Sequence, residues 1–191
     1  MRIGVLALQG AFIEHIRRLS QLGLSAREVR LPSDIQGLQA LIIPGGESTT
    51  IAKLMAGYGL MDPIRSFARR HAVWGTCAGM ILMAKEIGRD QPLLGLMDIV
   101  VERNAFGRQI DSFEEPLTVE CLKEGNTRQF PGIFIRAPRL VEAQGKAHIM
   151  ARLKDGTAVA AVEGQWLATS FHPELSDDLR FHEYFLELAR E

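Results

Sequence analysis

Cysteine, net charge and long hydrophobic runs are all scarce in this sequence, and each scarcity argues against a class of protein. Two cysteines in 191 residues, Cys77 and Cys121, do not suggest a disulfide framework. The net charge is -1 and no run is rich in lysine or arginine, so we expect no nucleic-acid partner. No apolar run approaches the roughly 20 residues of a membrane span, and residues 3–8 are too short a run for a signal peptide. We therefore expect a cytoplasmic protein that does not insert into membranes.

The first half of the chain alternates between apolar strand-like runs and helical patterns. Strands are expected at residues 2–8, 27–31, 38–43 and just before Cys77, and helices at residues 12–22, 51–58 and 61–70. This alternation predicts a parallel sheet covered on both faces, with function at the carboxyl ends of its strands. His15 lies in the first helix. A lone helical histidine is more often a surface or satisfied residue than a catalyst, so we leave it out of the site.

The second half of the chain is dominated by short strand-like segments with glycine turns. The expected strands are residues 99–102, 117–122, 132–135, 148–153, 158–163 and 165–171, and a final helix is expected at residues 178–189. Cys121 shares one face of its predicted strand with Leu117 and Val119, which indicates a core position. Together the two halves predict a single domain over residues 1–191. Its expected fold is a three-layer, flavodoxin-like α/β fold, with a mostly parallel mixed sheet and an antiparallel extension.

Cys77 lies in the stretch VWGTCAGMILMA at residues 73–84, which predicts a strand that breaks sharply and restarts as a helix. Gly75 and Gly79 flank the thiol at two residues on either side, as in a nucleophile elbow with cysteine in place of serine. Such a turn places the sulfur at a helix N-terminus, where unpaired N–H groups favour a negative charge. Because a thiolate is the nucleophilic form of cysteine, Cys77 is the candidate nucleophile.

The sequence His172-Pro173-Glu174 supplies a base and a residue that orients it. Proline biases His172 toward an extended backbone, and residues two apart in an extended chain project to the same side. Glu174 can then accept a hydrogen bond from one imidazole nitrogen while the other nitrogen faces Cys77. The prediction is a catalytic triad of Cys77, His172 and Glu174.

An attacking thiolate creates an oxyanion that needs hydrogen-bond donors. The N–H of Ala78 follows the nucleophile, and the Gly45-Gly46 pair follows an apolar strand, so Ala78 and Gly46 are the candidate oxyanion donors. Residues 45–48 lack the Gly-Lys-Ser/Thr ending of a phosphate loop. Glu47 suits a substrate ammonium, and Arg103 and Arg136 can clamp a carboxylate. These residue types indicate an amino acid with a side-chain carbonyl, which points to glutamine.

Two groups of motifs carry a family resemblance. GTCAG at residues 75–79 and the His172-Pro173-Glu174 sequence resemble the class I, triad-type glutamine amidotransferases. The segments at residues 4–10, 44–50, 101–109 and 134–138 narrow the resemblance to the family of glutaminase subunits of pyridoxal 5'-phosphate synthase. The similarity extends over the whole chain.

The resemblance implies hydrolysis of L-glutamine through a thioester on Cys77, without a metal or cofactor. It implies glutamine contacts at Gly46, Glu47, Ser48, Arg103, Ile135 and Arg136. It also implies a partner, a barrel-shaped synthase subunit in a large hetero-oligomer, which takes up the ammonia to make pyridoxal 5'-phosphate. Two other hypotheses remain: a stand-alone thiol hydrolase or peptidase on a similar fold, and a non-enzymatic scaffold subunit in which Cys77 is structural.

Overall fold

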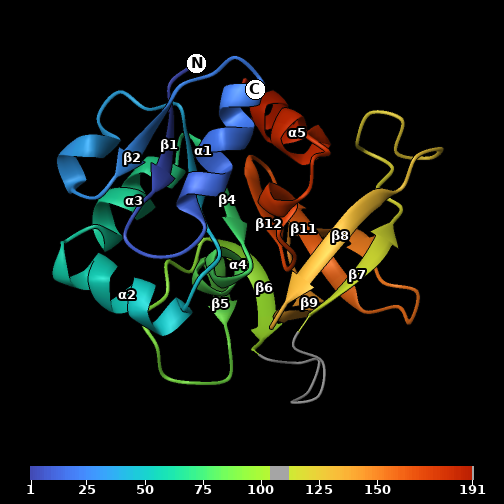
Figure 1. Ribbon diagram of the computed structural model, residues 1–191. Coiled ribbons are helices and arrows are strands. Elements are labelled where there is room, and N and C mark those ends of the chain that lie inside the picture. The colour runs from blue at the N-terminus through green and yellow to red at the C-terminus, as the bar shows by residue number, and fades with distance from the viewer. Residues whose placement is uncertain (104–111, 191) are drawn as a thin grey trace.

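The computed structural model describes residues 1–103 and 112–190 and has an α/β architecture (Figure 1). Among these residues, ten strands form one sheet, in which nine follow the order β2-β1-β3-β4-β12-β11-β9-β6-β5 and β10 pairs with β11. Strands β7 and β8 form a separate antiparallel pair. The strands are β1 (Ile3–Leu6), β2 (Ala26–Val29), β3 (Ala40–Ile43), β4 (Ala72–Thr76), β5 (Ala84–Glu86), β6 (Met97–Glu102), β7 (Ser112–Leu117), β8 (Phe130–Ile135), β9 (Arg139–Ala143), β10 (His148–Arg152), β11 (Ala158–Glu163) and β12 (Trp166–Thr169).

The main sheet has a parallel part, an antiparallel part and, at its far edge, the parallel pair β6-β5. Strands β2, β1, β3, β4 and β12 pair in parallel. The pairs β12-β11, β11-β9 and β9-β6 are antiparallel. Gly156 and Gly164 lie in the turns on either side of β11 with positive φ, as their predicted hairpin turns require. The predicted α/β fold, with a mixed sheet and an antiparallel extension, is confirmed.

Helices cover both faces of the sheet, which gives three layers (Figure 1). Leu41, Ile43 and Val73 pack in one hydrophobic core with α2, α3 and α4, whereas Ile42 and Trp74 pack in a second core with α1 and α5. Successive side chains of a strand point to opposite faces, so β3 and β4 contribute to both cores. Within the two described ranges, no helix is long and apolar enough to cross a membrane. The helices are α1 (Phe12–Gln21), α2 (Ser48–Gly57), α3 (Met61–Ala68), α4 (Ala78–Met83), α5 (Arg180–Leu188) and the short 3-10 helices η1 (Pro32–Ile35) and η2 (Pro173–Leu175).

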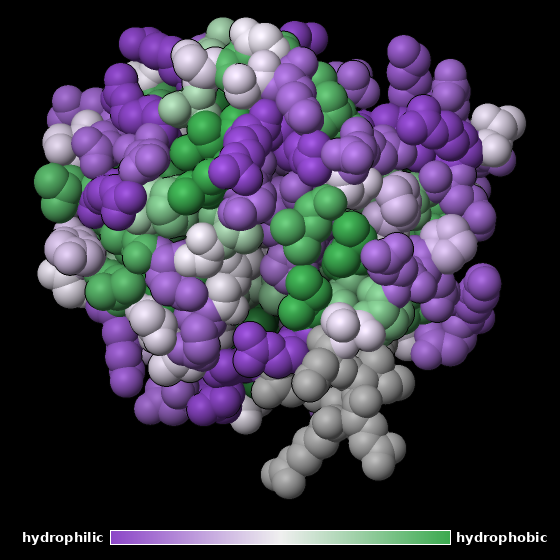
Figure 2. Space-filling view, viewed as in Figure 1, coloured by the Kyte–Doolittle hydropathy of each residue, from purple (hydrophilic) through white to green (hydrophobic). Residues whose placement is uncertain are grey.

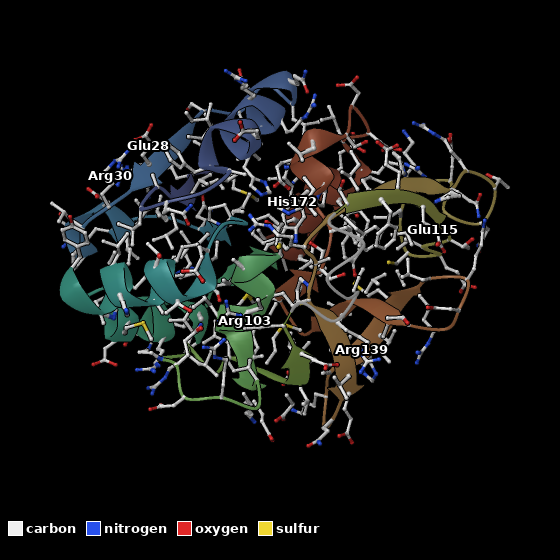
Figure 3. All side chains as sticks on the ribbon, turned by 60° about the horizontal axis from the view of Figure 1, so that its bottom comes forward. Glu28, Arg30, Arg103, Glu115, Arg139 and His172 are labelled. Carbon is white, nitrogen blue, oxygen red and sulfur yellow. The ribbon has the colours of Figure 1, made fainter. Side chains whose placement is uncertain are left out.

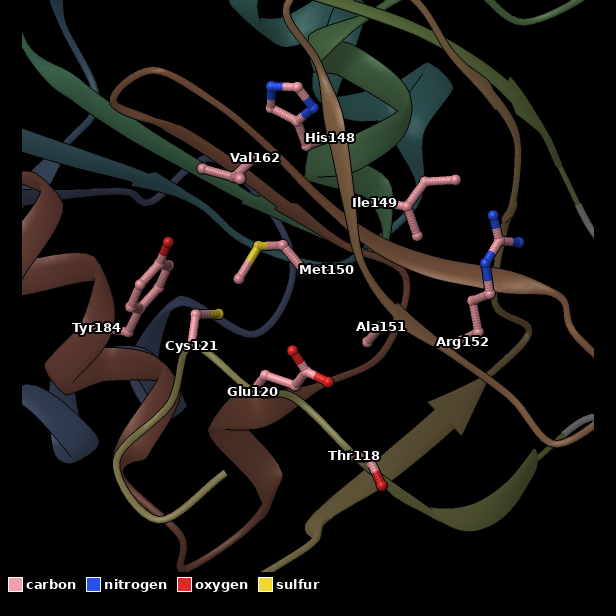
Figure 4. Close-up of a pocket in the computed structure, with 10 residues that line it drawn as sticks. All are labelled: Thr118, Glu120, Cys121, His148, Ile149, Met150, Ala151, Arg152, Val162 and Tyr184. Carbon is pink, nitrogen blue, oxygen red and sulfur yellow. The ribbon is translucent and has the colours of Figure 1, made fainter. Parts of the chain in front are cut away.

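The predicted strand at residues 117–122 is wrong beyond its first residue. Strand β7 ends at Leu117, and the chain then turns, with the Leu122 N–H donating to the Val119 carbonyl oxygen at 3.1 Å. The turn breaks the alternation of the side chains, so Cys121 is exposed and does not pack in the core. It lines a pocket of about 510 Å³ together with residues of β10, β11 and α5, including Tyr184 (Figure 4).

Strands β5 and β9 were not indicated by the sequence patterns. Strand β5 follows α4 directly, so no loop residues mark its start. In β9, Leu140 is buried while Arg139, Val141 and Glu142 are exposed, so the segment lacks the alternation of a half-buried strand.

Candidate active site

Cys77 stands at the sharp turn between β4 and α4. The strand ends at Thr76 and the helix begins at Ala78, so the cysteine alone joins them. Its backbone angles, φ 47° and ψ -101°, are rare for a residue with a side chain. Its N–H donates to the Thr169 carbonyl oxygen on β12 at 2.8 Å, and only 6% of the residue is exposed. The strand, turn and helix of a nucleophile elbow are therefore present, with the thiol at the helix N-terminus.

Gly75 and Gly79 allow α4 to lie directly on the sheet. A Cβ atom on Gly75 would lie 2.5 Å from the backbone of Gly79. A Cβ atom on Gly79 would lie 2.0 Å from the carbonyl oxygen of Ile43 on β3. Both distances are far shorter than any van der Waals contact. The elbow therefore requires glycine at both positions.

Replacing Gly79 by alanine is expected to lower the free energy of unfolding by about 3 kcal/mol, because the added methyl group forces α4 away from β3. Alanine is otherwise the better helix former by about 1 kcal/mol, so a loss identifies the clash. Gly57 in α2 is the matched control, since a Cβ atom there meets nothing within 4 Å. Denaturant unfolding of both variants measures the difference. Equal stability of Gly79→Ala and Gly57→Ala would contradict the expected result.

His172 and Glu174 lie beside the thiol as the sequence predicts. His172 Nδ1 is 2.6 Å from Glu174 Oε1, and the glutamate side chain is completely buried. The His172 N–H donates to the Ile133 carbonyl oxygen on β8 at 2.8 Å, which holds the segment against the β7-β8 pair. The Cys77 thiol lies close enough to the imidazole to raise its pKa. The structure thus brings together the thiol, imidazole and carboxylate from residues 77, 172 and 174.

The two neighbours of His172 set its charge. Burial lowers the pKa of the imidazole, but hydrogen bonds with Cys77 and Glu174, together with their negative charges, outweigh burial and raise the pKa of His172 to about 10. His172 is therefore protonated at neutral pH.

Gly45 lies against both members of this pair. A Cβ atom on Gly45 would lie 2.4 Å from His172 Cε1 and 3.3 Å from Cys77 Cβ. The Gly45 carbonyl oxygen accepts a hydrogen bond from the Ala11 N–H at 3.0 Å. Because the peptide is trans and planar, the Gly46 N–H points away from Ala11. The structure therefore holds the Gly45-Gly46 peptide next to the triad in one orientation.

The side chains of Glu47 and Arg103, both predicted to bind substrate, are paired with each other. Arg103 Nη2 lies 3.1 Å from Glu47 Oε1. Glu47 is also the N-cap of α2, and its carboxylate accepts from the N–H groups of Thr49 and Thr50 at 3.1 and 2.7 Å. Partial burial raises the pKa of Glu47, but hydrogen bonds from Thr50 and Thr49 outweigh it and lower the pKa to about 2. Glu47 is therefore a carboxylate across the whole neutral range.

Gln91 joins Arg103 to the start of α2 and was missed by the sequence analysis. Its Oε1 accepts from Arg103 Nη1 at 3.1 Å, Thr49 Oγ1 at 3.2 Å and buried Ser48 Oγ at 3.4 Å. Arginine can only donate, so the orientation of the Gln91 amide is fixed. Its Nε2 is buried without a partner among the residues that the structure describes. Gln91 lies in an irregular segment between β5 and β6, where no periodicity marks it.

Ile135 and Arg136 lie at the end of β8. The Ile135 carbonyl oxygen is 4.0 Å from Cys77 Sγ, so β8 reaches the thiol. Arg136 is exposed and has a positive φ of 42°. Figure 3 shows Arg103 and His172 in the middle of the molecule, whereas Glu28 and Arg30 lie at its edge. The motif at residues 101–109 is described only to residue 103; residues 104–109 lie outside the described residues.

His15, which the sequence analysis left out of the site, contacts the triad. It is completely buried in α1, and its Nε2 lies 3.4 Å from Glu174 Oε2 and 3.2 Å from Thr76 Oγ1. Its Nδ1 lies 3.1 Å from His182 Nε2 on α5. Leu19, one helical turn further along α1, is also completely buried, so the i,i+4 spacing of His15 and Leu19 was the available signal for burial.

Comparisons with known proteins show the family of the chain. The model of the SNO glutamine amidotransferase family matches residues 5–191. The chain is 56% identical to the pyridoxal 5'-phosphate synthase subunit PdxT of Dehalococcoides mccartyi, covering 100% of this chain and 98% of the relative. It is 50% identical to the protein of the same name from Geobacillus kaustophilus, with coverages of 100% and 96%.

Solved structures show the same fold. A crystal structure described as a glutamine amidotransferase is 50% identical, covers 99% of both chains and has a TM-score of 0.92. PurLQS from Thermotoga maritima shares the fold with a TM-score of 0.73 at 15% identity, covering 97% of both chains. The chain therefore belongs to the SNO glutamine amidotransferase family.

Proposed function

We propose that the protein hydrolyses L-glutamine to L-glutamate and ammonia and supplies the ammonia to a synthase subunit that makes pyridoxal 5'-phosphate. The observation that carries the proposal is the contact of Cys77, His172 and Glu174 at an elbow, in a chain of the amidotransferase family. The relatives named as pyridoxal 5'-phosphate synthase subunits support a synthase subunit as the acceptor of the ammonia. Residues 1–191 act as one amidotransferase domain in the cytoplasm.

The first half of the reaction forms a thioester. The Cys77 thiolate attacks the side-chain carboxamide carbon of glutamine, and the negative charge moves to the carboxamide oxygen. The N–H groups of Ala78 and Gly46 receive this oxyanion. His172 then donates its proton to the leaving nitrogen, and ammonia departs as the C–N bond breaks.

The second half of the reaction releases glutamate. Neutral His172 now accepts a proton from water, and the resulting hydroxide attacks the thioester carbon. The same two N–H groups receive the oxyanion again, and the C–S bond breaks to regenerate the thiolate. Glu174 keeps the imidazole in one orientation through both halves, because its carboxylate accepts from Nδ1 at 2.6 Å.

Glutamine is held through its charged ends. Glu47 faces the α-ammonium group and Arg103 the α-carboxylate, with Gly46, Ser48, Ile135 and Arg136 completing the pocket. Within the protein, Glu47 and Arg103 form an ion pair with each other. Binding therefore exchanges one internal ion pair for two contacts with a substrate of matching charges.

Replacing Arg103 by alanine is expected to raise the KM for glutamine about tenfold or more, with a smaller change in kcat, because a charged substrate contact is lost. Arg103→Lys keeps the charge but not the planar fork, so its KM should lie between those of the wild type and the alanine variant. Arg139→Ala is the control, since this arginine pairs with Glu102 at the surface. Steady-state ammonia release measures all three variants. An unchanged KM in Arg103→Ala would show that the assigned contact is wrong.

The synthase partner, a barrel-shaped subunit in a large hetero-oligomer, docks close to the thiol. Exposed hydrophobic side chains support such a surface: Ile135 is 36% exposed beside Cys77, and Leu175 is 39% exposed just after the triad. Figure 2 shows hydrophobic side chains in the middle of this face, beside β8. Exposed apolar groups that gather in one place are typical of interaction sites.

Docking is expected to increase the glutaminase rate through the Gly45-Gly46 peptide. Glycine allows this peptide to flip, and a misdirected oxyanion donor costs about 3 kcal/mol, or two to three powers of ten in rate. The experiment that tests the function measures ammonia release from glutamine with and without the synthase subunit encoded by the same genome. Equal rates would count against activation by docking. Absence of glutamine hydrolysis in the assembled complex would overturn the function itself.

A further inference from the structure

The carboxylate that orients His172 has a second oxygen, and that oxygen faces another histidine. Glu174 Oε1 contacts His172, while Glu174 Oε2 lies 3.4 Å from His15 Nε2, with both side chains completely buried. Oε2 makes no hydrogen bond within the normal distance and angle limits to any described residue. Hydrogen bonds around a catalytic group are often long in the free enzyme and shorten when substrate is bound. The His15 imidazole is therefore placed to hold the back of the carboxylate.

The neighbours of His15 fix which nitrogen carries its proton. Nε2 faces the Glu174 carboxylate, which only accepts, and Thr76 Oγ1 at 3.2 Å, so Nε2 carries the hydrogen. Nδ1 must then accept, and its partner at 3.1 Å is His182 Nε2. Burial, followed by electrostatic interactions with His182 and His172, lowers the pKa of His15 well below its usual value. Burial, followed by the positive charge of Arg18, lowers the pKa of His182 to about 3. Both imidazoles are thus neutral.

We propose that His15 is a positioning residue for glutamine hydrolysis: its Nε2–H fixes the Glu174 carboxylate so that Oε1 stays directed at His172, and His182 fixes the His15 tautomer. This inference rests on the proposed function of the triad. His15 touches neither the sulfur nor the substrate, so it acts through Glu174. Its effect belongs to kcat and to the pH profile, with little effect on glutamine binding.

The charged and titratable groups packed around His172, Glu174 and His15 come from several elements. Cys77 lies beyond His172, and His182 lies beyond His15 on α5. Arg18 on α1 donates from Nε to the Glu174 carbonyl oxygen at 3.0 Å and from Nη1 to Asp177 at 2.9 Å. A change in the pH profile is assigned to His15 only if variants of His15 with and without an Nε2 donor differ from each other.

The substitutions His15→Gln and His15→Asn distinguish the effect of the Nε2 hydrogen bond from the effect of filling the buried space. The Nε2 of glutamine reaches the position of histidine Nε2, whereas the amide of asparagine reaches only the position of Nδ1. We expect kcat to fall about ten- to hundredfold in His15→Ala and His15→Asn, because each variant loses a hydrogen bond to a charged group. The KM for glutamine should change less than twofold. The alkaline limb of the pH profile should also move to lower pH in both. His15→Gln should restore most of kcat and return the alkaline limb of the pH profile to its wild-type position.

The measurement is ammonia release from glutamine by the assembled complex with the synthase subunit, as a function of pH. Phe185→Leu is the stability control, because Phe185 packs on Trp74 in the same core and its hydrocarbon ring carries no group that could donate a hydrogen bond to Glu174. It should lower the melting temperature without moving the pH profile. Equal kcat in the Gln, Asn and Ala variants, or rescue by Asn as complete as by Gln, would overturn the role of His15. Retention of activity in Cys77→Ala would instead overturn the proposed function, so the two failures are distinct.

Discussion

Replacing Cys77 by alanine is expected to abolish glutamine hydrolysis, with a loss of roughly 10³-fold or more, because no other described group can form the thioester at the elbow. Cys77→Ser should be almost as inactive, since a hydroxyl group is far harder to ionise than a thiol. The elbow itself should survive both changes, because Gly75 and Gly79 determine its backbone. Ammonia release by the complex with the synthase subunit measures the loss.

The second cysteine provides the matched control. Cys121 is exposed and lines a pocket with residues of β10, β11 and α5, and none of the triad residues contributes to that pocket (Figure 4). Cys121→Ala should therefore keep activity within about twofold of the wild type. A diazoketone analogue of glutamine should label the wild type and Cys121→Ala but not Cys77→Ser. Labelling of Cys77→Ser, or full activity of Cys77→Ala, would leave the scaffold hypothesis standing.

Replacing Glu174 by glutamine is expected to lower kcat by about 10³-fold, because an amide donor can turn toward His172 and select the wrong imidazole tautomer. Its steric change is small, so the fold should persist. Glu187→Gln on the exposed side of α5 removes the same charge at a distance and should have almost no effect. A kcat for Glu174→Gln within threefold of the wild type would exclude Glu174 from the triad.

The pH profile gives the Glu174 variant a second readout. His172 must be protonated to protonate the leaving ammonia, and its pKa is raised to about 10, so kcat/KM should decline only near pH 10 in the wild type. Without the carboxylate the pKa falls toward 6.5, and the decline should move to lower pH. The same shift acts on stability: protonated His172 favours the folded state fully below pH 6.5, and this contribution is lost as the pH rises to about 10. If kcat/KM of Glu174→Gln still declines only near pH 10, the assignment of this decline to His172 is wrong.

Local patterns predicted the parts of the site that depend on local backbone geometry. Gly75 and Gly79 marked the elbow because only glycine tolerates the approach of α4 to β3 and β4. The spacing of His172 and Glu174 was sufficient because both side chains belong to one short extended segment. Similarly, the alternation of strands and helices predicted the parallel half of the sheet.

The remaining features depend on tertiary packing that no local pattern records. His15 meets Glu174 across 159 positions of sequence only because α1 and η2 pack together beside β4. Cys121 was assigned to the buried face of a strand because its neighbours alternate. The strand ends at Leu117, however, and the turn that follows leaves the Cys121 side chain exposed. Gln91 could not be predicted because its role depends on a hydrogen bond from Arg103, which lies in another segment of the chain.

Helix α1 and its N-cap residue Ala11 touch the reaction site at two separate places. The Ala11 N–H holds the Gly45 carbonyl oxygen, and the His15 imidazole faces the Glu174 carboxylate. Four residues of helix span about 6 Å, a length that backbone hydrogen bonds keep nearly constant. The helix thus serves as a rigid spacer, and it sets the separation between the peptide that faces the thiol and the carboxylate behind the imidazole without contacting glutamine. Any force that tilts this helix must disturb both contacts together.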